Sequence, residues 1–86
     1  MNMIQVQLFG AFSELVPERV LQVEVDGDSV ADLRRAMHEQ LTQRWPSFRS
    51  GLLAYSAFAD EQRVLRDSEP LPDHGRVAVL PPVSGG

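Results

Sequence analysis

The segment "SVADLRRAMHEQLTQR", residues 29–44, decides how this chain folds, because its pattern is helical and segments that resemble strands precede and follow it. Its apolar side chains recur at helical spacing and form one stripe: Val30, Leu33, Met37 and Leu41. Ser29 can cap the first turn, and Asp32, three residues on, completes a capping box. Pro46 disfavours helical geometry at the residue before it, so we expect the helix to end near Arg44.

Strand-like patterns flank this helix. Residues 3–9, "MIQVQLF", and 19–26, "RVLQVEVD", alternate apolar and polar side chains and predict a long hairpin. After the helix we expect a strand in "LLAYSAF" (52–58), a short one in "RVL" (63–65) and a last one in "RVAVL" (76–80).

This order of elements predicts an α+β domain of the β-grasp type. One main helix would cover one face of a mixed sheet of four to five strands, with the first and last strands side by side at the centre. A ferredoxin-like fold would need a second helix, and no other segment has the required period.

Length and composition narrow the class of protein. The 86 residues suffice for one domain, and we expect a β-grasp domain over residues 1–80 and an extended, flexible C-terminal tail over 81–86. The net charge of −4 and the scattered arginines argue against a nucleic-acid partner. We expect neither a membrane span nor a secretory leader, and the absence of cysteine favours the cytoplasm.

The body of the domain offers no convincing active site. The two histidines, His38 and His74, have no cysteine to accompany them, and their spacing does not suggest a metal site, so we expect no metal. No serine lies in a G-x-S-x-G elbow, and no glycine-rich phosphate loop occurs. The function therefore has to be sought on the surface or at an end of the chain.

A surface for a partner protein is predicted at the end of the last strand. Leu80 falls opposite Val77 and Val79, and either Phe58 or Tyr55 must also face away from the helix. We predict that Leu80 and Phe58 form this interface.

The sequence "PPVSGG", residues 81–86, carries the remaining chemistry. Pro81 and Pro82 cannot donate backbone hydrogen bonds, so they end the sheet and favour an extended tail. Gly85 and Gly86 have no Cβ and can pass through a narrow channel. The α-carboxylate of Gly86 is the predicted reactive group, which adenylation by ATP would activate toward a persulfide, a thiol or an amine.

Over essentially its whole length the chain resembles the small subunit of molybdopterin synthase, a ubiquitin-like sulfur carrier. The resemblance lies in "LFGAFSEL" (8–15), "SVADLRRAM" (29–37) and "LPDHGRVAVLPPVSGG" (71–86), and its most specific part is the ending "PPVSGG". The chain departs from the usual pattern at Phe58-Ala59, at His74-Gly75-Arg76 and at Leu80.

The resemblance implies a role in molybdenum cofactor biosynthesis. An adenylating enzyme would activate Gly86 with ATP used in trans, and the acyl-adenylate would become a thiocarboxylate. Pro81, Pro82, Val83, Ser84 and Gly85 would enter the large synthase subunit, in a heterotetramer, where sulfur reaches a pyranopterin precursor. The chain would bind no cofactor itself, and the active-site side chains would belong to the partner, so it is a co-substrate subunit rather than an enzyme.

Three other hypotheses fit the same ending. The thiocarboxylate could serve thiazole formation, tRNA thiolation or cysteine formation. Gly86 could instead form isopeptide bonds with lysines of other proteins, although this chain has no lysine and could not build chains of itself through side-chain amines. Finally, the domain could be a plain binding module with an incidental tail.

Overall fold

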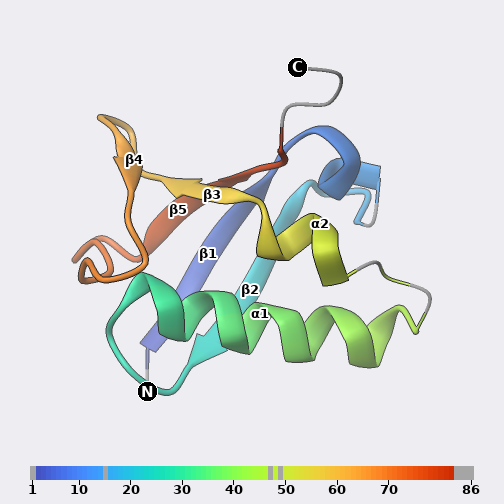
Figure 1. Cartoon of the computed structure of the whole chain (residues 1–86), viewed down its shortest axis with the longest axis horizontal. Helices are drawn as coiled ribbons and strands as arrows, with labels where there is room; N and C mark the ends of the chain where they lie inside the picture. The colour runs from blue at the N-terminus through green and yellow to red at the C-terminus, as the bar shows by residue number, and fades with distance from the viewer. Residues whose placement is uncertain (1, 15, 47, 49, 83–86) are drawn as a thin grey trace.

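The computed structural model describes residues 2–14, 16–46, 48 and 50–82. These described residues form strands (β), two α-helices (α) and one 3₁₀ helix (η), shown in Figure 1. In chain order they are β1 (Asn2–Leu8), η1 (Gly10–Glu14), β2 (Val20–Val25), α1 (Val30–Arg44), α2 (Ser50–Ala54), β3 (Ala57–Ala59), β4 (Val64–Leu65) and β5 (Arg76–Leu80).

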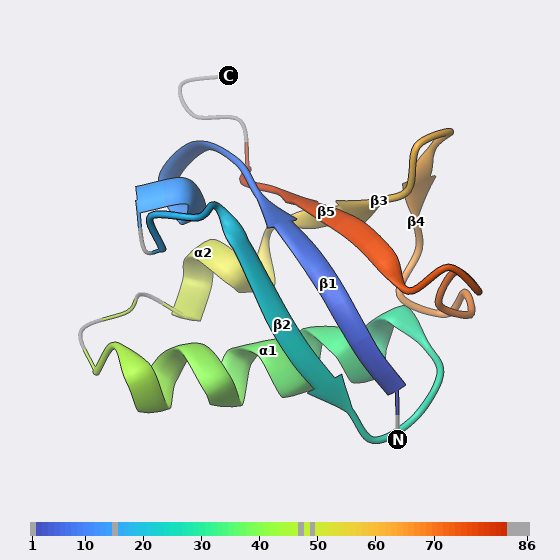
Figure 2. The ribbon, with the colours of Figure 1, turned by 180° about the vertical axis from the view of Figure 1, so that it is seen from behind.

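The strands form one mixed sheet in the order β2-β1-β5-β3-β4. β1 runs parallel to β5, whereas the pairs β1–β2, β3–β5 and β3–β4 are antiparallel. α1 lies across one face of this sheet, and the view from behind shows the strands in front of the helix (Figures 1 and 2). The first and last strands are therefore neighbours at the centre, which confirms the predicted β-grasp fold.

The start of α1 is fixed by its own cap and by a distant loop. The Ser29 hydroxyl accepts a hydrogen bond from the Asp32 backbone N–H, and the Asp32 carboxylate accepts one from the Ser29 N–H, so the predicted capping box is present. The N–H groups of Val30 and Ala31 donate to the carbonyls of Glu69 and Asp67, both at 2.9 Å. The loop before β5 thus satisfies donors that every helix N-terminus leaves without a partner.

The core lies between α1 and the sheet. The predicted helical stripe is buried, and it packs on inward side chains of β1, β2 and β5. Because successive side chains of a strand point to opposite faces, the remaining side chains lie on the face of the sheet away from α1, which we call the open face. It consists of Met3, Gln5, Gln7, Phe9, Val20, Gln22, Glu24, Ala57, Ala59, Val64, Arg76, Ala78 and Leu80.

The prediction for residues 52–58 is wrong in part. Residues Ser50–Ala54 form the short helix α2, and the strand β3 is confined to Ala57–Ala59. Between them Ser56 ends the helix, because its N–H donates to the Leu53 carbonyl at 3.1 Å and its hydroxyl donates to the Leu52 carbonyl. A short apolar run cannot be assigned to helix or strand by its period, which is why the pattern misled here.

No helix in the part of the chain that the structure describes is long and apolar enough to cross a membrane.

Candidate functional site

The candidate site is the place where β5 leaves the sheet. Because β1 and β5 are parallel, their carboxyl ends lie at the same edge, with Leu8 in register with Val79. β1 turns away at Gly10, whose φ of 58° lies in the left-handed region. β5 continues into Pro81, and a Cβ added to Gly10 would lie only 2.6 Å from the Pro81 Cγ. The first proline of the tail is therefore packed directly against the end of the neighbouring strand.

The tail itself is placed only at its start. Pro81 is half-buried and Pro82 is exposed, directly after the last residue of β5. Val83, Ser84, Gly85 and Gly86 lie outside the described residues, so the reactive carboxylate and the partner-binding tail remain predictions. β5 ends at Leu80, the residue at which the sequence predicted the end of the last strand.

The open face borders this exit. Leu80 is half-buried and alternates with the buried Val77 and Val79, so it lies on the open face as predicted. Ala57 is in register with Leu80, and two pairs further along Ala59 is in register with Ala78. A depression of about 290 Å³ lies beside Ala59 and Ala78, lined also by Gln5, Gln7 and Phe9. A partner side chain could enter there without any rearrangement of the strands.

The prediction that Phe58 belongs to this interface is wrong. Phe58 is fully buried, because α2 ends before β3 and the strand register places Phe58 opposite the inward-facing Val79. Tyr55, the alternative considered, is 80% exposed, but it lines a groove between α1 and α2 on the helix side.

Three exposed apolar residues of the open face were missed. Phe9 is 41% exposed, Met3 58% and Val64 55%. Met3 and Phe9 could have been found, because they share the odd-numbered positions of the first strand with Gln5 and Gln7. Phe9 lies at the same end of the sheet as Leu80, whereas Met3 lies at the opposite end of β1 and Val64 in the edge strand β4.

Charged groups at the far end of the depression have structural partners. The Asp60 carboxylate accepts hydrogen bonds from the backbone N–H groups of Gln62 and Arg63, which hold its pKa below the usual range. His74 Nδ1 accepts from the Arg76 N–H at 3.1 Å, and its Nε2 lies 3.6 Å from Glu61 Oε1. Within the described residues no group of three or more potential ligands could hold a metal ion.

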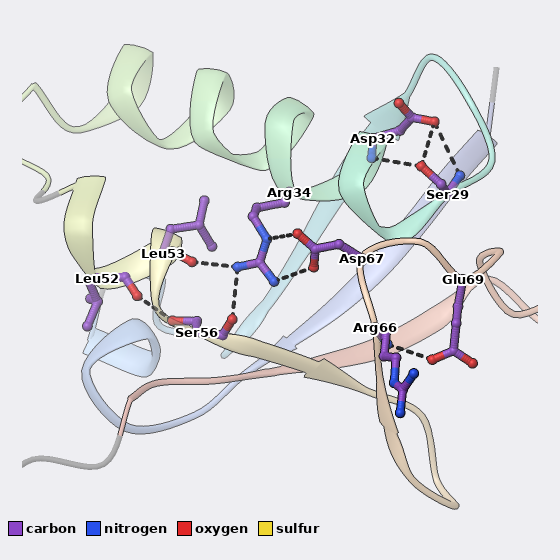
Figure 3. Close-up of polar contacts among 9 residues, drawn as sticks. All are labelled: Ser29, Asp32, Arg34, Leu52, Leu53, Ser56, Arg66, Asp67 and Glu69. Atoms are coloured by element: carbon purple, nitrogen blue, oxygen red, sulfur yellow. Dashed lines mark hydrogen bonds and ion pairs between the residues drawn. The ribbon is translucent and has the colours of Figure 1, made fainter.

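Arg34 is the most heavily bonded side chain of α1, although its position in the helical pattern suggested only a surface residue. Its guanidinium binds both carboxylate oxygens of Asp67, at 2.8 and 3.1 Å, and donates to the carbonyls of Leu53 and Ser56 at 2.7 and 2.8 Å (Figure 3). It also lies 5.0 Å from the Phe58 ring centroid. We call these five residues the Arg34 cluster. Its function is structural, because every nitrogen of the guanidinium is already bound.

The main helix α1 lies on a mixed five-stranded sheet, and the central last strand is followed directly by the sequence "PPVSGG". This arrangement defines a small ubiquitin-like β-grasp protein with a C-terminal glycine pair. More specifically, the chain belongs to the ThiS family, whose model matches residues 6–86. It is thus a ubiquitin-like sulfur carrier, a kind of protein that works with activating enzymes and partner proteins.

The structure is similar to the crystal structure of SAMP1 from Haloferax volcanii. The TM-score is 0.65 and the sequence identity 27%, over 99% of this chain and 100% of that chain. Comparison with curated protein sequences gives no match.

Proposed function

We propose that this sulfur carrier serves molybdenum cofactor biosynthesis as the small subunit of molybdopterin synthase. The observation that carries the proposal is the ending "PPVSGG" directly after the central strand β5. Membership of the ThiS family supports the carrier role, and the form of the ending supports this pathway among those that use such carriers.

The chemistry takes place at Gly86. A carboxylate oxygen attacks the α-phosphorus of ATP in the adenylating enzyme, and pyrophosphate leaves. The resulting acyl-adenylate is an electrophile that hydrosulfide can attack at the carbonyl carbon, releasing AMP and leaving a thiocarboxylate. The sulfur is bound to the main-chain carbonyl carbon of Gly86, so the carrier needs no cysteine side chain, and the chain contains no cysteine.

The described residues fit a subunit that presents its terminus to a partner. Two of their charged side chains, Arg34 and Asp60, are held by hydrogen bonds within the domain. The open face offers an apolar surface beside the exit of β5, with Leu80 nearest to the tail. In the proposed complex this surface contacts the large synthase subunit, and residues 81–86 enter the active site of that subunit.

Intact-mass spectrometry provides the first test. The full chain is incubated with ATP, an adenylating enzyme of proven activity and sulfide, and one oxygen of Gly86 should be replaced by sulfur. A chain lacking Gly85 and Gly86 is the control and should remain unmodified. An unchanged mass of the full chain would refute the carrier mechanism.

The second test concerns the acceptor. The thiocarboxylate form is mixed with the large synthase subunit and the cyclic pyranopterin precursor, and formation of the dithiolene is measured. Equal activity of the chain lacking Gly85 and Gly86 would refute the role of the tail. Sulfur transfer only in a thiazole, tRNA or cysteine-forming system, or attachment of Gly86 to lysines of other proteins, would refute the proposed pathway.

A further inference from the structure

Gly10 and Pro81 form a close contact that depends on the absence of a side chain at position 10. Gly10 follows β1 by two residues, and Pro81 follows β5 by one, so the parallel strands bring them together. A Cβ on Gly10 would lie 2.6 Å from Pro81 Cγ and 3.5 Å from its Cδ. Real Cβ atoms do not approach a carbon so closely, so the proline ring occupies space that any other residue at position 10 would need.

The turn that carries Gly10 is held firmly in place. The Ser13 hydroxyl donates to the Gly10 carbonyl at 2.7 Å, and the Phe12 N–H donates to the Phe9 carbonyl at 3.2 Å. Phe12 is fully buried, with its ring centroid 6.3 Å from that of Phe48. The core therefore fixes η1, and η1 fixes the surface on which Pro81 rests.

We propose that Gly10 is a positioning residue for the tail. The Pro81 ring packs into the space left by the missing side chain of Gly10, and this contact sets the direction in which residues 82–86 leave the sheet. The ring also fixes the backbone of Pro81 at φ near −65°, so a shift of the ring is passed on to the following residues. The inference rests on the proposed function, since direction matters only if the tail must enter an enzyme.

Gly75 provides a matched control. It also has a positive φ, 71°, but it precedes β5 and a Cβ there would meet only the Met3 carbonyl, at 3.3 Å. Asparagine tolerates the left-handed region better than other residues with a side chain. Gly10→Asn and Gly75→Asn therefore both place asparagine in the left-handed region, but only Gly10→Asn introduces a side chain that clashes with the Pro81 ring.

The first measurement follows the tail directly. Because the chain has no cysteine, Gln22→Cys and Ser84→Cys allow two spin labels to be attached to the full chain, and pulsed electron spin resonance gives their distance distribution. Gly10→Asn should shift this distribution, and Gly75→Asn should leave it unchanged. The same distribution in all three chains would overturn the proposal, whether or not Gly86 is ever activated.

The second measurement is activation of unlabelled chains by the adenylating enzyme. A displacement of about 1 Å at a reacting group can cost roughly a hundredfold in rate, so Gly10→Asn should lower kcat/KM about 10- to 100-fold. Gly75→Asn should change it by less than about twofold. Both variants should show similar midpoints of urea unfolding, so that lost stability does not explain the difference. Equal activation of the two variants would also overturn the proposal.

Failure of the proposed function has a different signature. If the wild-type chain is not adenylated at all, the carrier mechanism fails, and the spin-label distances alone decide whether Gly10 directs the tail.

A double variant tests the contact itself. Pro81→Ala removes the Cγ and Cδ atoms that a side chain at position 10 would meet. The Gly10→Asn/Pro81→Ala chain should recover most of the activation measured for Pro81→Ala alone. If Gly10→Asn is as harmful in the Pro81→Ala background as in the wild type, the ring is not the cause and the proposal fails.

Discussion

The two faces of the sheet differ in polarity, and within β3 they also differ in the size of their side chains. Phe58 points toward α1 and is fully buried, whereas its neighbours Ala57 and Ala59 lie on the open face. The covered face uses large side chains that fill space, and at its rim the Arg34 cluster ties α1, α2 and β3 together. The open face carries polar side chains such as Gln5, Gln7 and Arg76, and it has a depression beside Ala59 and Ala78. Stability and partner binding are therefore expected to depend on different faces.

Phe58→Ala should have the largest effect on stability. Truncation of a fully buried phenylalanine leaves a cavity and typically costs about 3–5 kcal/mol in the free energy of unfolding. Urea denaturation should show this loss, whereas Tyr55→Ala, at an 80% exposed position, should change the free energy by less than about 0.5 kcal/mol. A smaller loss for Phe58→Ala than for Tyr55→Ala would contradict the assignment of Phe58 to the core.

Arg34→Ala comes next. It removes the charged donor from the Ser56 carbonyl and leaves the Leu53 carbonyl with the Ser56 N–H alone. Hydrogen bonds to charged groups are worth about 1.5–3 kcal/mol, so we expect a loss of about 2–3 kcal/mol. Arg34→Lys keeps the charge but not the planar fork, and it should recover only part of this loss. Full stability of Arg34→Ala in urea unfolding would show that the contacts of the Arg34 side chain contribute nothing to the stability of the fold.

Leu80→Ser probes the opposite face. Its half-buried position should limit the loss of stability to about 1 kcal/mol. If the open face contacts the partner, binding to the large synthase subunit should weaken by about 1–2 kcal/mol, measured by calorimetry. Tyr55→Ser, at an exposed position on the helix side of the molecule, is the control. Equal affinities for both variants would argue against an interface at Leu80.

The smallest effect concerns pH. Hydrogen bonds from the Arg63 side chain and the Arg66 N–H lower the pKa of Glu69 from 4.5 to about 2. Because the folded pKa is depressed, the ionised Glu69 contributes its full stabilisation above pH 4.5 and loses it as the pH falls toward 2.

Glu69→Gln removes this contribution. The difference in urea midpoint between wild type and variant should be largest at pH 7 and should shrink between pH 4.5 and pH 2. A difference that stays constant over this range would show that the charge of Glu69 does not stabilise the fold.

The order of the main elements and the β-grasp fold could be predicted from the sequence, because the patterns that indicate them lie within single segments of the chain. The cap at Ser29, the stripe from Val30 to Leu41 and the alternation in β1, β2 and β5 each follow from spacing alone. The tail stands out because its composition has no counterpart in the rest of the chain, and its role stays a prediction.

What the sequence could not provide depends on contacts between distant segments. The run at 52–58 could not be divided into α2 and β3 by period, and the orientation of Phe58 followed from that division. The partners of Arg34 lie 19 to 33 residues away, and Gly10 meets Pro81 only because β1 and β5 are parallel neighbours. Such pairs have no signature in a single sequence.

The parallel pairing of β1 and β5 also has a mechanical consequence. The chain enters β1 at one end of the sheet and leaves β5 at the opposite end, so tension applied between Asn2 and Pro81 acts along the two central strands. Their backbone hydrogen bonds would then be loaded together in shear instead of opening one after another. A partner that pulls on the tail would therefore meet a stiff anchor, and the domain should resist extension better than its size suggests.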